Sequence, residues 1–147
     1  NKFVVLYFGS ILPVQGVDVI LKCVEQLRDE KDIHFLLIGP IEGKYNKPQS
    51  SNISYITWVS QTELAEYIAI ADLCLGGHFA ESIGKAERTI PGKVYIYKAM
   101  GKRVVLGNSS ANRELYEENE ENIYVDRGNV DALAEAIVKE KNLYLEN

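Results

Sequence analysis

The sequence predicts an α/β protein built on a parallel β-sheet with helices on both faces. Short apolar runs alternate with segments whose apolar residues recur at helical spacing, and this alternation extends over almost the whole chain. The apolar runs are nearly continuous, as in strands buried on both faces. Strands and helices that alternate in this way form right-handed crossovers, which place helices on both sides of the sheet. The 147 residues suffice for one domain with its own core.

The strands are predicted from apolar runs that end at glycine or in polar loops. The first run, Phe3 to Phe8, is continuously apolar and stops at Gly9. In open parallel sheets, ligands bind beyond the carboxyl ends of the strands. The predicted strands are residues 3–8, 33–38, 53–57, 72–75, 103–106 and 123–125. The loops expected on the ligand side are 9–16, 39–52, 57–60, 76–90 and 107–110.

The helices are predicted from apolar stripes and from their start signals. Ser60 and Glu63 form a capping box, in which the side chain and the backbone N–H of two residues satisfy each other. Pro91 suits the first turn of a helix, because its missing N–H would have no partner there. The predicted helices start at Val17, after Ser60, at Pro91, around Asn112 and at about Asn129.

Composition excludes several classes of function. The net charge of −5 makes general nucleic-acid binding unfavourable, so an anionic ligand would need a local basic cluster. Cys23 and Cys74 lie in apolar surroundings and are expected to be buried thiols, which fits a reducing compartment. Two scattered cysteines and two scattered histidines do not predict a metal site. No apolar run reaches the ~20 residues that span a membrane.

Residues 84–105 are the stretch with the strongest functional signal. A basic loop leads through Pro91 into a short helix that Gly101 can end, and an apolar strand follows. The open N–H groups at the helix start, together with Arg88 and Lys93, predict an anion-binding site. The alternative is a crossover helix preceded by two solvated cations.

Five stretches of the chain resemble a known family: YFGSILPVQGVDVIL, IADLCLGG, RTIPGKVYIYKAMGKRVV, GNSSANRELY and ENIYVDRGNVDALAEAI. They are similar to the C-terminal, donor-binding domain of family-four glycosyltransferases of the GT-B fold, and the resemblance covers nearly the whole chain. It implies two Rossmann-like domains facing across a cleft, with the nucleotide-sugar donor held by the C-terminal one and the acceptor by the N-terminal one. It also implies transfer with retention at the anomeric carbon and without a bound divalent metal.

The resemblance sets expectations for the protein as a whole. Residues 1–147 would be a single domain, the C-terminal half of a longer protein, as the absence of an initiator methionine also suggests. No cofactor is expected, and the donor would be a UDP- or GDP-linked sugar used in polysaccharide or glycoconjugate assembly. The implied location is cytoplasmic, with any contact to the inner face of the membrane made through the missing part.

The resemblance also assigns residues to the donor phosphates. Gly9 matches the glycine that lets the loop approach the phosphates, although a strand-end glycine in a tight turn would look the same. Gly16 matches the glycine that opens the first helix. Ser10 and Gln15 occupy positions where many members carry Arg and Lys against the diphosphate. Arg88 and Lys93 would restore the lost charge, since both can bind phosphate oxygens.

Other assignments concern the base, the ribose and the sugar. Trp58 and Val59 follow the third strand, where the family makes main-chain contacts with the base, but a core or rim aromatic is the favoured interpretation of Trp58. Gly77 and His78 begin the loop that faces the sugar, and His78 could equally be a surface histidine. Ile96 replaces a glutamate that binds ribose hydroxyls. Isoleucine accepts no hydrogen bond, and an unpaired desolvated hydroxyl costs ~1–3 kcal/mol.

Alternatives of other classes stay open. The missing glutamate at Ile96 could indicate a degenerate, non-catalytic GT-B domain that acts as a scaffold or regulatory module. A nucleotide-sugar epimerase can share the fold, but no acid/base residue stands out, and the catalytic residues are unknown. A flavodoxin-like or receiver domain would show the same alternation. Ser109 and Ser110 could touch the sugar, although a cap on the following helix is the favoured interpretation.

Overall fold

The computed structural model describes residues 2–9, 16–41, 45–77, 79–80 and 92–146. Their strands form one six-stranded sheet in the order β3-β2-β1-β4-β5-β6, with every neighbouring pair parallel. The chain builds outward from β1 to β3 and then returns to the other side of β1, so the strand order reverses between β1 and β4. The strands are β1 (Phe3–Phe8), β2 (Ile33–Ile38), β3 (Ile53–Ile56), β4 (Leu73–Leu75), β5 (Val104–Gly107) and β6 (Asn122–Val125).

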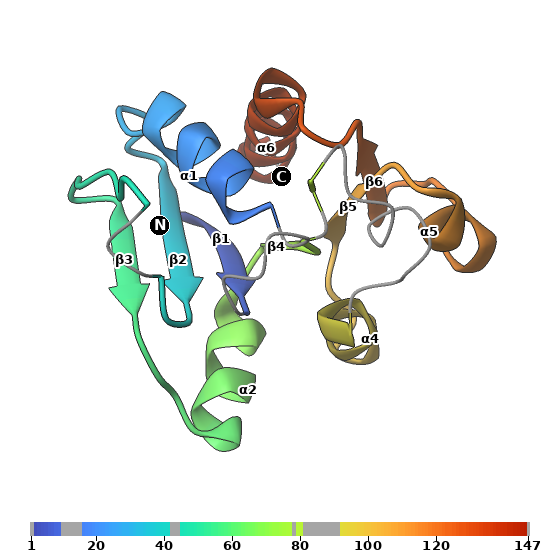
Figure 1. Ribbon diagram of the computed structural model, residues 1–147, viewed down its shortest axis with the longest axis horizontal. Helices are drawn as coiled ribbons and strands as arrows, with labels where there is room; N and C mark the ends of the chain where they lie inside the picture. The colour runs from blue at the N-terminus through green and yellow to red at the C-terminus, as the bar shows by residue number, and fades with distance from the viewer. Residues whose placement is uncertain (1, 10–15, 42–44, 78, 81–91, 147) are drawn as a thin grey trace.

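Helices cover both faces of this sheet. The helices are α1 (Val17–Gln26), α2 (Gln61–Ile70), α4 (Gly92–Ala99), α5 (Ser110–Leu115) and α6 (Val130–Leu145). Figure 1 shows α1 and α6 on one side of the sheet and α2 and α4 on the other. Each side has its own apolar cluster: Val5 and Tyr7 of β1 point into the first, and Leu6 points into the second. This alternation follows from the two-residue period of a strand.

The predicted fold class is confirmed, and the differences are confined to element ends. Asp72 lies just before β4, because its carboxylate accepts a hydrogen bond from the Val4 N–H at 2.8 Å and joins the strand start to β1. Thr57 and Arg103 lie just outside β3 and β5. Helix α5 begins at Ser110, two residues before the predicted Asn112, because Ser109 is its N-cap.

The starts of α2 and α5 are set by side-chain caps. Ser60 and Glu63 form the predicted capping box at α2, with Ser60 Oγ accepting from the Glu63 N–H at 3.1 Å. Ser109 Oγ accepts from the Asn112 N–H at 3.1 Å, which confirms the cap interpretation for this serine. Such a cap stabilises a helix by roughly 1 kcal/mol, because it satisfies an N–H that has no partner within the helix.

The two cysteines are free and buried, as predicted. Burial raises the pKa of both the Cys23 and the Cys74 thiol to about 12. Cys23 belongs to the apolar cluster under α1 and Cys74 to the opposite one. Within the part of the chain that the structure describes, no helix is long and apolar enough to cross a membrane.

Candidate functional site

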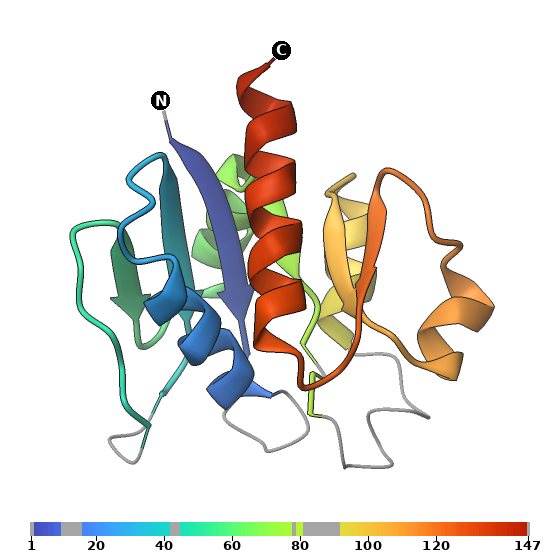
Figure 2. The ribbon, with the colours of Figure 1, turned by 90° about the horizontal axis from the view of Figure 1, so that it is seen from above.

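The candidate site lies at the carboxyl ends of β1 and β4, where the strand order reverses. Figure 2 shows the arrowhead of β1 pointing to the edge of the molecule at which α1 and α6 begin. Gly9 directly follows β1, and Gly76 and Gly77 directly follow β4. In doubly wound sheets, the splayed connections at such a reversal leave a crevice outside the strand ends, where ligands bind.

A side chain at Gly9 would be strained, because Gly9 has a φ of 150°, and two neighbouring side chains would have to move. A Cβ atom at Gly9 would lie 2.9 Å from the Tyr7 Oη and 3.1 Å from the Lys93 Nζ. The Gly9 carbonyl in turn faces Gly39, at the end of β2, where a Cβ would lie only 2.1 Å from the Gly9 oxygen. The two glycines therefore let the segments at the carboxyl ends of β1 and β2 approach each other closely. The Lys93 ammonium lies beside this backbone.

Lys93 is a buried cation at the start of α4. The residue is only 8% exposed, and its ammonium lies 5.3 Å from the centroid of the Tyr7 ring and 5.9 Å from that of Phe8. Burial lowers the pKa of Lys93 to about 8. The alternative of a solvated loop cation is therefore wrong for this residue. Lys93 is the second residue of α4 and is buried beside the carboxyl end of β1.

The backbone that follows β4 is fixed from two sides. A Cβ at Gly16, the N-cap of α1, would lie 2.8 Å from the Phe79 Cβ and 2.9 Å from the Ala80 nitrogen, so α1 begins against this segment. From the other side, the Gly128 N–H donates to the Phe79 carbonyl at 2.7 Å. Arg127 adds hydrogen bonds to the Ala80 carbonyl at 3.2 Å and to the Asn108 carbonyl at 3.3 Å. One guanidinium thus joins the segments that follow β4 and β5.

We expect the change Arg127→Gln to lower the free energy of unfolding by about 1–2 kcal/mol, because hydrogen bonds from a charged donor to two partly buried carbonyls would be lost. Urea denaturation measures the effect. Arg28→Gln is the matched control, since Arg28 pairs with Glu25 at the surface and such pairs contribute little. Equal losses in both variants would contradict a clamping role for Arg127.

The structure places the predicted site residues in different environments. Lys93 and Gly9 come together, and Gly77 is buried at the end of β4. Trp58 is 76% exposed, so of the two favoured interpretations, a core or a rim aromatic, the core one is wrong. Val59 is half-buried and packs against the cluster under α2 and α4.

Ile96 lies on α4, three residues beyond Lys93, and is 44% exposed. It presents an apolar surface where the resemblance implies a glutamate. The predictions for Ser10, Gln15, His78 and Arg88 fall on positions outside the described residues. Among the described residues, no three side chains of His, Cys, Asp or Glu are grouped so that they could hold a metal ion.

Three contributors to this edge were not predicted from the sequence: Tyr7, Gly39 and Arg127. Tyr7 stands inside a continuous apolar strand and has the pattern of a core residue. Burial raises the pKa of its phenol well above the usual range, and nearby Tyr45 adds to this effect. The position of Gly39 at the end of an apolar run indicated a strand end, but not its contact with Gly9. Arg127 donates a hydrogen bond to a residue 47 positions away in the chain, and no local sequence pattern predicts such a contact.

Together, the strand order, the close-packed glycines and the buried lysine define a Rossmann-like domain with a candidate anion site at its switch point. The chain belongs to the family described as Glycosyl transferases group 1, whose family model matches residues 2–140. A comparison with curated proteins found no match.

Solved structures of glycosyltransferases share the fold. The crystal structure of Anabaena HepE in complex with UDP-glucose matches with a TM-score of 0.72 and 19% identity, over 95% of this chain and 39% of that one. Sucrose-phosphate synthase from Thermosynechococcus elongatus matches with a TM-score of 0.70 and 18% identity, over 95% of this chain and 36% of that one. The present chain thus spans less than two fifths of the length of these proteins.

A third structure is comparable to the chain over most of its own length. The catalytic domain of cholesterol-alpha-glucosyltransferase from Helicobacter pylori matches with a TM-score of 0.67 and 18% identity, over 99% of this chain and 90% of that one. The fold prediction, a Rossmann-like sheet corresponding to one domain of a GT-B protein, is confirmed by these matches.

Proposed function

We propose that this chain is the donor-binding domain of a retaining glycosyltransferase, and that it holds the diphosphate of a nucleotide-sugar at the carboxyl ends of β1 and β4. The acceptor, a glycan, a lipid or another molecule, would be bound by an N-terminal domain of the same protein. Transfer would proceed without a divalent metal, so protein groups would have to balance the charge of the leaving nucleoside diphosphate. This assignment names Gly9, Gly16, Gly77 and Lys93 as residues that adjoin the phosphates or the sugar.

The observation that carries the proposal is the Lys93 ammonium against the Gly9 backbone. An anion is attracted more strongly to a cation in such buried, low-dielectric surroundings than to one at the surface. Gly9 has no side chain to block that approach, and the N–H groups of the first turn of α4 favour an anion at the same end. A diphosphate satisfies both groups, and a cation held in place before the reaction stabilises the charge that develops on the leaving group.

UDP is the first nucleotide to test, because HepE was crystallised with UDP and with UDP-glucose. The experiment is a thermal-shift series of the 147-residue chain, without metal, against UDP, GDP, ADP, CMP and common UDP- and GDP-sugars. A ligand at a hundred times its Kd adds ~2.7 kcal/mol of stability, which raises the melting temperature by several degrees. A shift with one nucleotide base supports the proposal, and no shift with any ligand at millimolar concentration contradicts it for this chain.

The alternative, a degenerate domain that serves as a scaffold or regulatory module, is favoured by one observation. Ile96 is exposed and apolar where a ribose-binding glutamate is expected, and it offers no hydrogen-bond acceptor. In a donor-binding domain, ribose binding would then be weak or supplied by another group.

The variant Ile96→Glu separates the two functions. For a working donor site, we expect wild-type binding of UDP and an affinity gain of roughly tenfold in the variant, since one hydrogen bond from a hydroxyl to a carboxylate contributes about 1.5 kcal/mol. The exposed position predicts a change in unfolding free energy of less than about 0.5 kcal/mol. Binding that exists only in the variant would instead identify the natural chain as the degenerate module. Isothermal titration calorimetry gives both affinities.

A further inference from the structure

The environment of Lys93 contains a feature that the proposed function does not by itself require. Tyr7 and Phe8 are consecutive residues of β1, so their side chains leave opposite faces of the sheet. Tyr7 belongs to the apolar cluster under α1 and α6, whereas Phe8 packs against the cluster under α2 and α4. Yet the Lys93 ammonium lies within 6 Å of both ring centroids, at 5.3 Å and 5.9 Å. It can reach both rings only from beyond the end of the strand.

Both distances are within the range in which a cation is attracted to the face of an aromatic ring. Tyr7 is 1% exposed and is packed in the apolar cluster around it. Its hydroxyl and the ammonium converge on the same side of Gly9, at 2.9 Å and 3.1 Å from the position of a Cβ there. The Tyr7 side chain and the Gly9 backbone therefore both limit where the ammonium can lie.

The second ring is tied to α4 itself. Phe8 stacks edge-on against Tyr97 with a centroid distance of 5.6 Å, and the buried Tyr97 hydroxyl donates to the Leu75 carbonyl at 3.0 Å. Tyr97 is four residues after Lys93, so the two side chains leave the same face of α4. This series of contacts joins β4, α4 and the end of β1, and it fixes the helix from which Lys93 extends.

We propose that Tyr7 and Phe8 form an aromatic bracket that positions the Lys93 ammonium over the end of β1 for a diphosphate, with the Tyr7 ring as its main positioning residue. The proposal rests on the proposed function, in which that diphosphate belongs to a nucleotide-sugar. It assigns a binding role to two consecutive residues of β1. A long flexible lysine loses affinity when its charge is not held in place, so the ring should affect binding of the phosphates and not of the nucleoside.

The test compares UDP with uridine in variants of the 147-residue chain. Tyr7→Leu removes the ring, and Tyr7→Phe keeps it while removing the hydroxyl. We expect Tyr7→Leu to weaken UDP binding by roughly 5- to 30-fold, the equivalent of one desolvated cation–ring contact. Uridine binding should be unchanged in both variants, and Tyr7→Phe should bind UDP within about twofold of the wild type.

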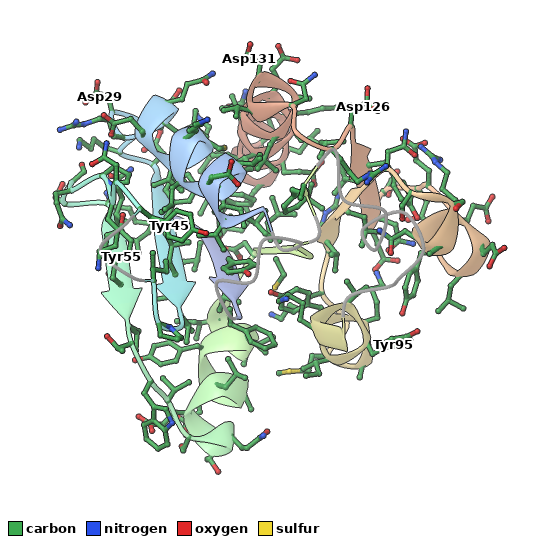
Figure 3. The ribbon with its side chains drawn as sticks, in the orientation of Figure 1. Asp29, Tyr45, Tyr55, Tyr95, Asp126 and Asp131 are labelled. Carbon is green, nitrogen blue, oxygen red and sulfur yellow. The ribbon has the colours of Figure 1, made fainter. Side chains whose placement is uncertain are left out.

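Tyr55→Leu is the matched control. Lys47 lies over the Tyr55 ring at 5.1 Å, so the variant removes the same type of contact elsewhere in the chain. Figure 3 shows Tyr55 on β3, which is an edge strand of the sheet and lies away from α4. UDP binding should not change in this variant. If Tyr7→Leu does not fold, Phe8→Leu removes the other ring from a half-buried position, and we expect it to weaken UDP binding at least twofold.

An NMR titration of the lysine side chains supplies a second readout that does not depend on UDP. In Tyr7→Leu, water should reach the ammonium and raise the pKa of Lys93 toward the ordinary value of a lysine, whereas Tyr7→Phe should leave it unchanged. The bracket is overturned by an unchanged Lys93 pKa in Tyr7→Leu, by equal losses of UDP and uridine, or by a Tyr7→Phe loss as large as that of Tyr7→Leu. Failure of the wild type to bind UDP would instead count against the proposed function, and the titration would still decide the role of Tyr7.

Discussion

Replacing Lys93 with methionine is expected to weaken UDP binding and, at the same time, to stabilise the fold at pH 7. The ammonium is the described cation closest to Gly9, and a lost charge-assisted contact costs about 1.5–3 kcal/mol, or roughly 10- to 150-fold in affinity. Methionine has a similar length and no charge, so it removes the cost of burying an ammonium. Because burial lowers the pKa of Lys93 to about 8, the charged lysine destabilises the wild type, and we expect the variant to gain roughly 1–3 kcal/mol in unfolding free energy.

The stabilisation should depend on pH in a defined direction. Because the pKa of Lys93 is lower in the folded chain than in the unfolded chain, the folded chain binds fewer protons between about pH 8 and pH 10.5. The free-energy cost of the wild-type lysine is therefore fully present below pH 8 and disappears as the pH rises through that window. The advantage of Lys93→Met should be largest at pH 7 and close to zero above pH 10.5.

The difference between variant and wild type must be used, because other groups act in the opposite sense. The buried thiols of Cys23 and Cys74 keep their protons to about pH 12 in the folded chain, so their contribution to stability falls as the pH rises above their unfolded values. These terms cancel between variant and wild type. Lys47→Met, which removes a half-buried lysine near Tyr55, is the control for lost charge.

Urea denaturation at several pH values and calorimetric titration with UDP measure the two effects of Lys93→Met. Loss of stability together with loss of binding would identify Lys93 as an ordinary structural residue. Unchanged UDP affinity would remove it from the site.

The largest expected loss of stability comes from Gly39→Ala. A Cβ at this position would lie 2.1 Å from the Gly9 carbonyl oxygen, and the contact involves backbone that cannot rotate away. Gly39 also has a φ of 134°, which side chains rarely adopt. Strain and overpacking together predict a loss of about 3–5 kcal/mol. Because the clash displaces Gly9, UDP binding should also fall in any protein that stays folded.

Variants at two other glycines separate the effect of backbone strain from that of the steric clash. Gly101 has a φ of 72° but nothing within 4 Å of a Cβ, so Gly101→Ala measures backbone strain alone, about 1–2 kcal/mol. Gly92 also has open space around it, and it lies at the start of α4, so Gly92→Ala should be neutral or stabilising by up to about 1 kcal/mol. Urea midpoints rank the three variants. A loss in Gly39→Ala no larger than that in Gly101→Ala would contradict the close contact between Gly39 and Gly9.

Much of the fold follows from local sequence patterns. The strand Phe3–Phe8 is predicted because its six residues are apolar and end at a glycine, and α2 begins where Ser60 and Glu63 form their box. The ends that differ are set by tertiary contacts. Asp72 precedes β4 because its carboxylate reaches the Val4 N–H, a partner 68 residues away that a local pattern does not contain.

The candidate site was predictable in part. Lys93 and Gly9 were assigned to the phosphates from motifs, and the structure brings them together. Tyr7 was not assigned, because a tyrosine in a buried strand has the pattern of a core residue and its position beside an ammonium depends on how α4 packs. The sequence did not decide between a core and a rim position for Trp58, because a tryptophan after an apolar strand fits either, and the structure places it exposed.

The most direct test of the donor-binding proposal is an amide NMR titration of the 147-residue chain with UDP. Binding at the carboxyl ends of β1 and β4 predicts the largest shifts at the N–H groups of Gly9, Gly77 and Lys93, with little change at the amino ends of the strands, near Phe3 and Asp72. Uridine should cause smaller shifts at the same three residues, since it carries no phosphate. Shifts that are largest at the amino ends, or no shifts at millimolar UDP, would contradict the proposed site.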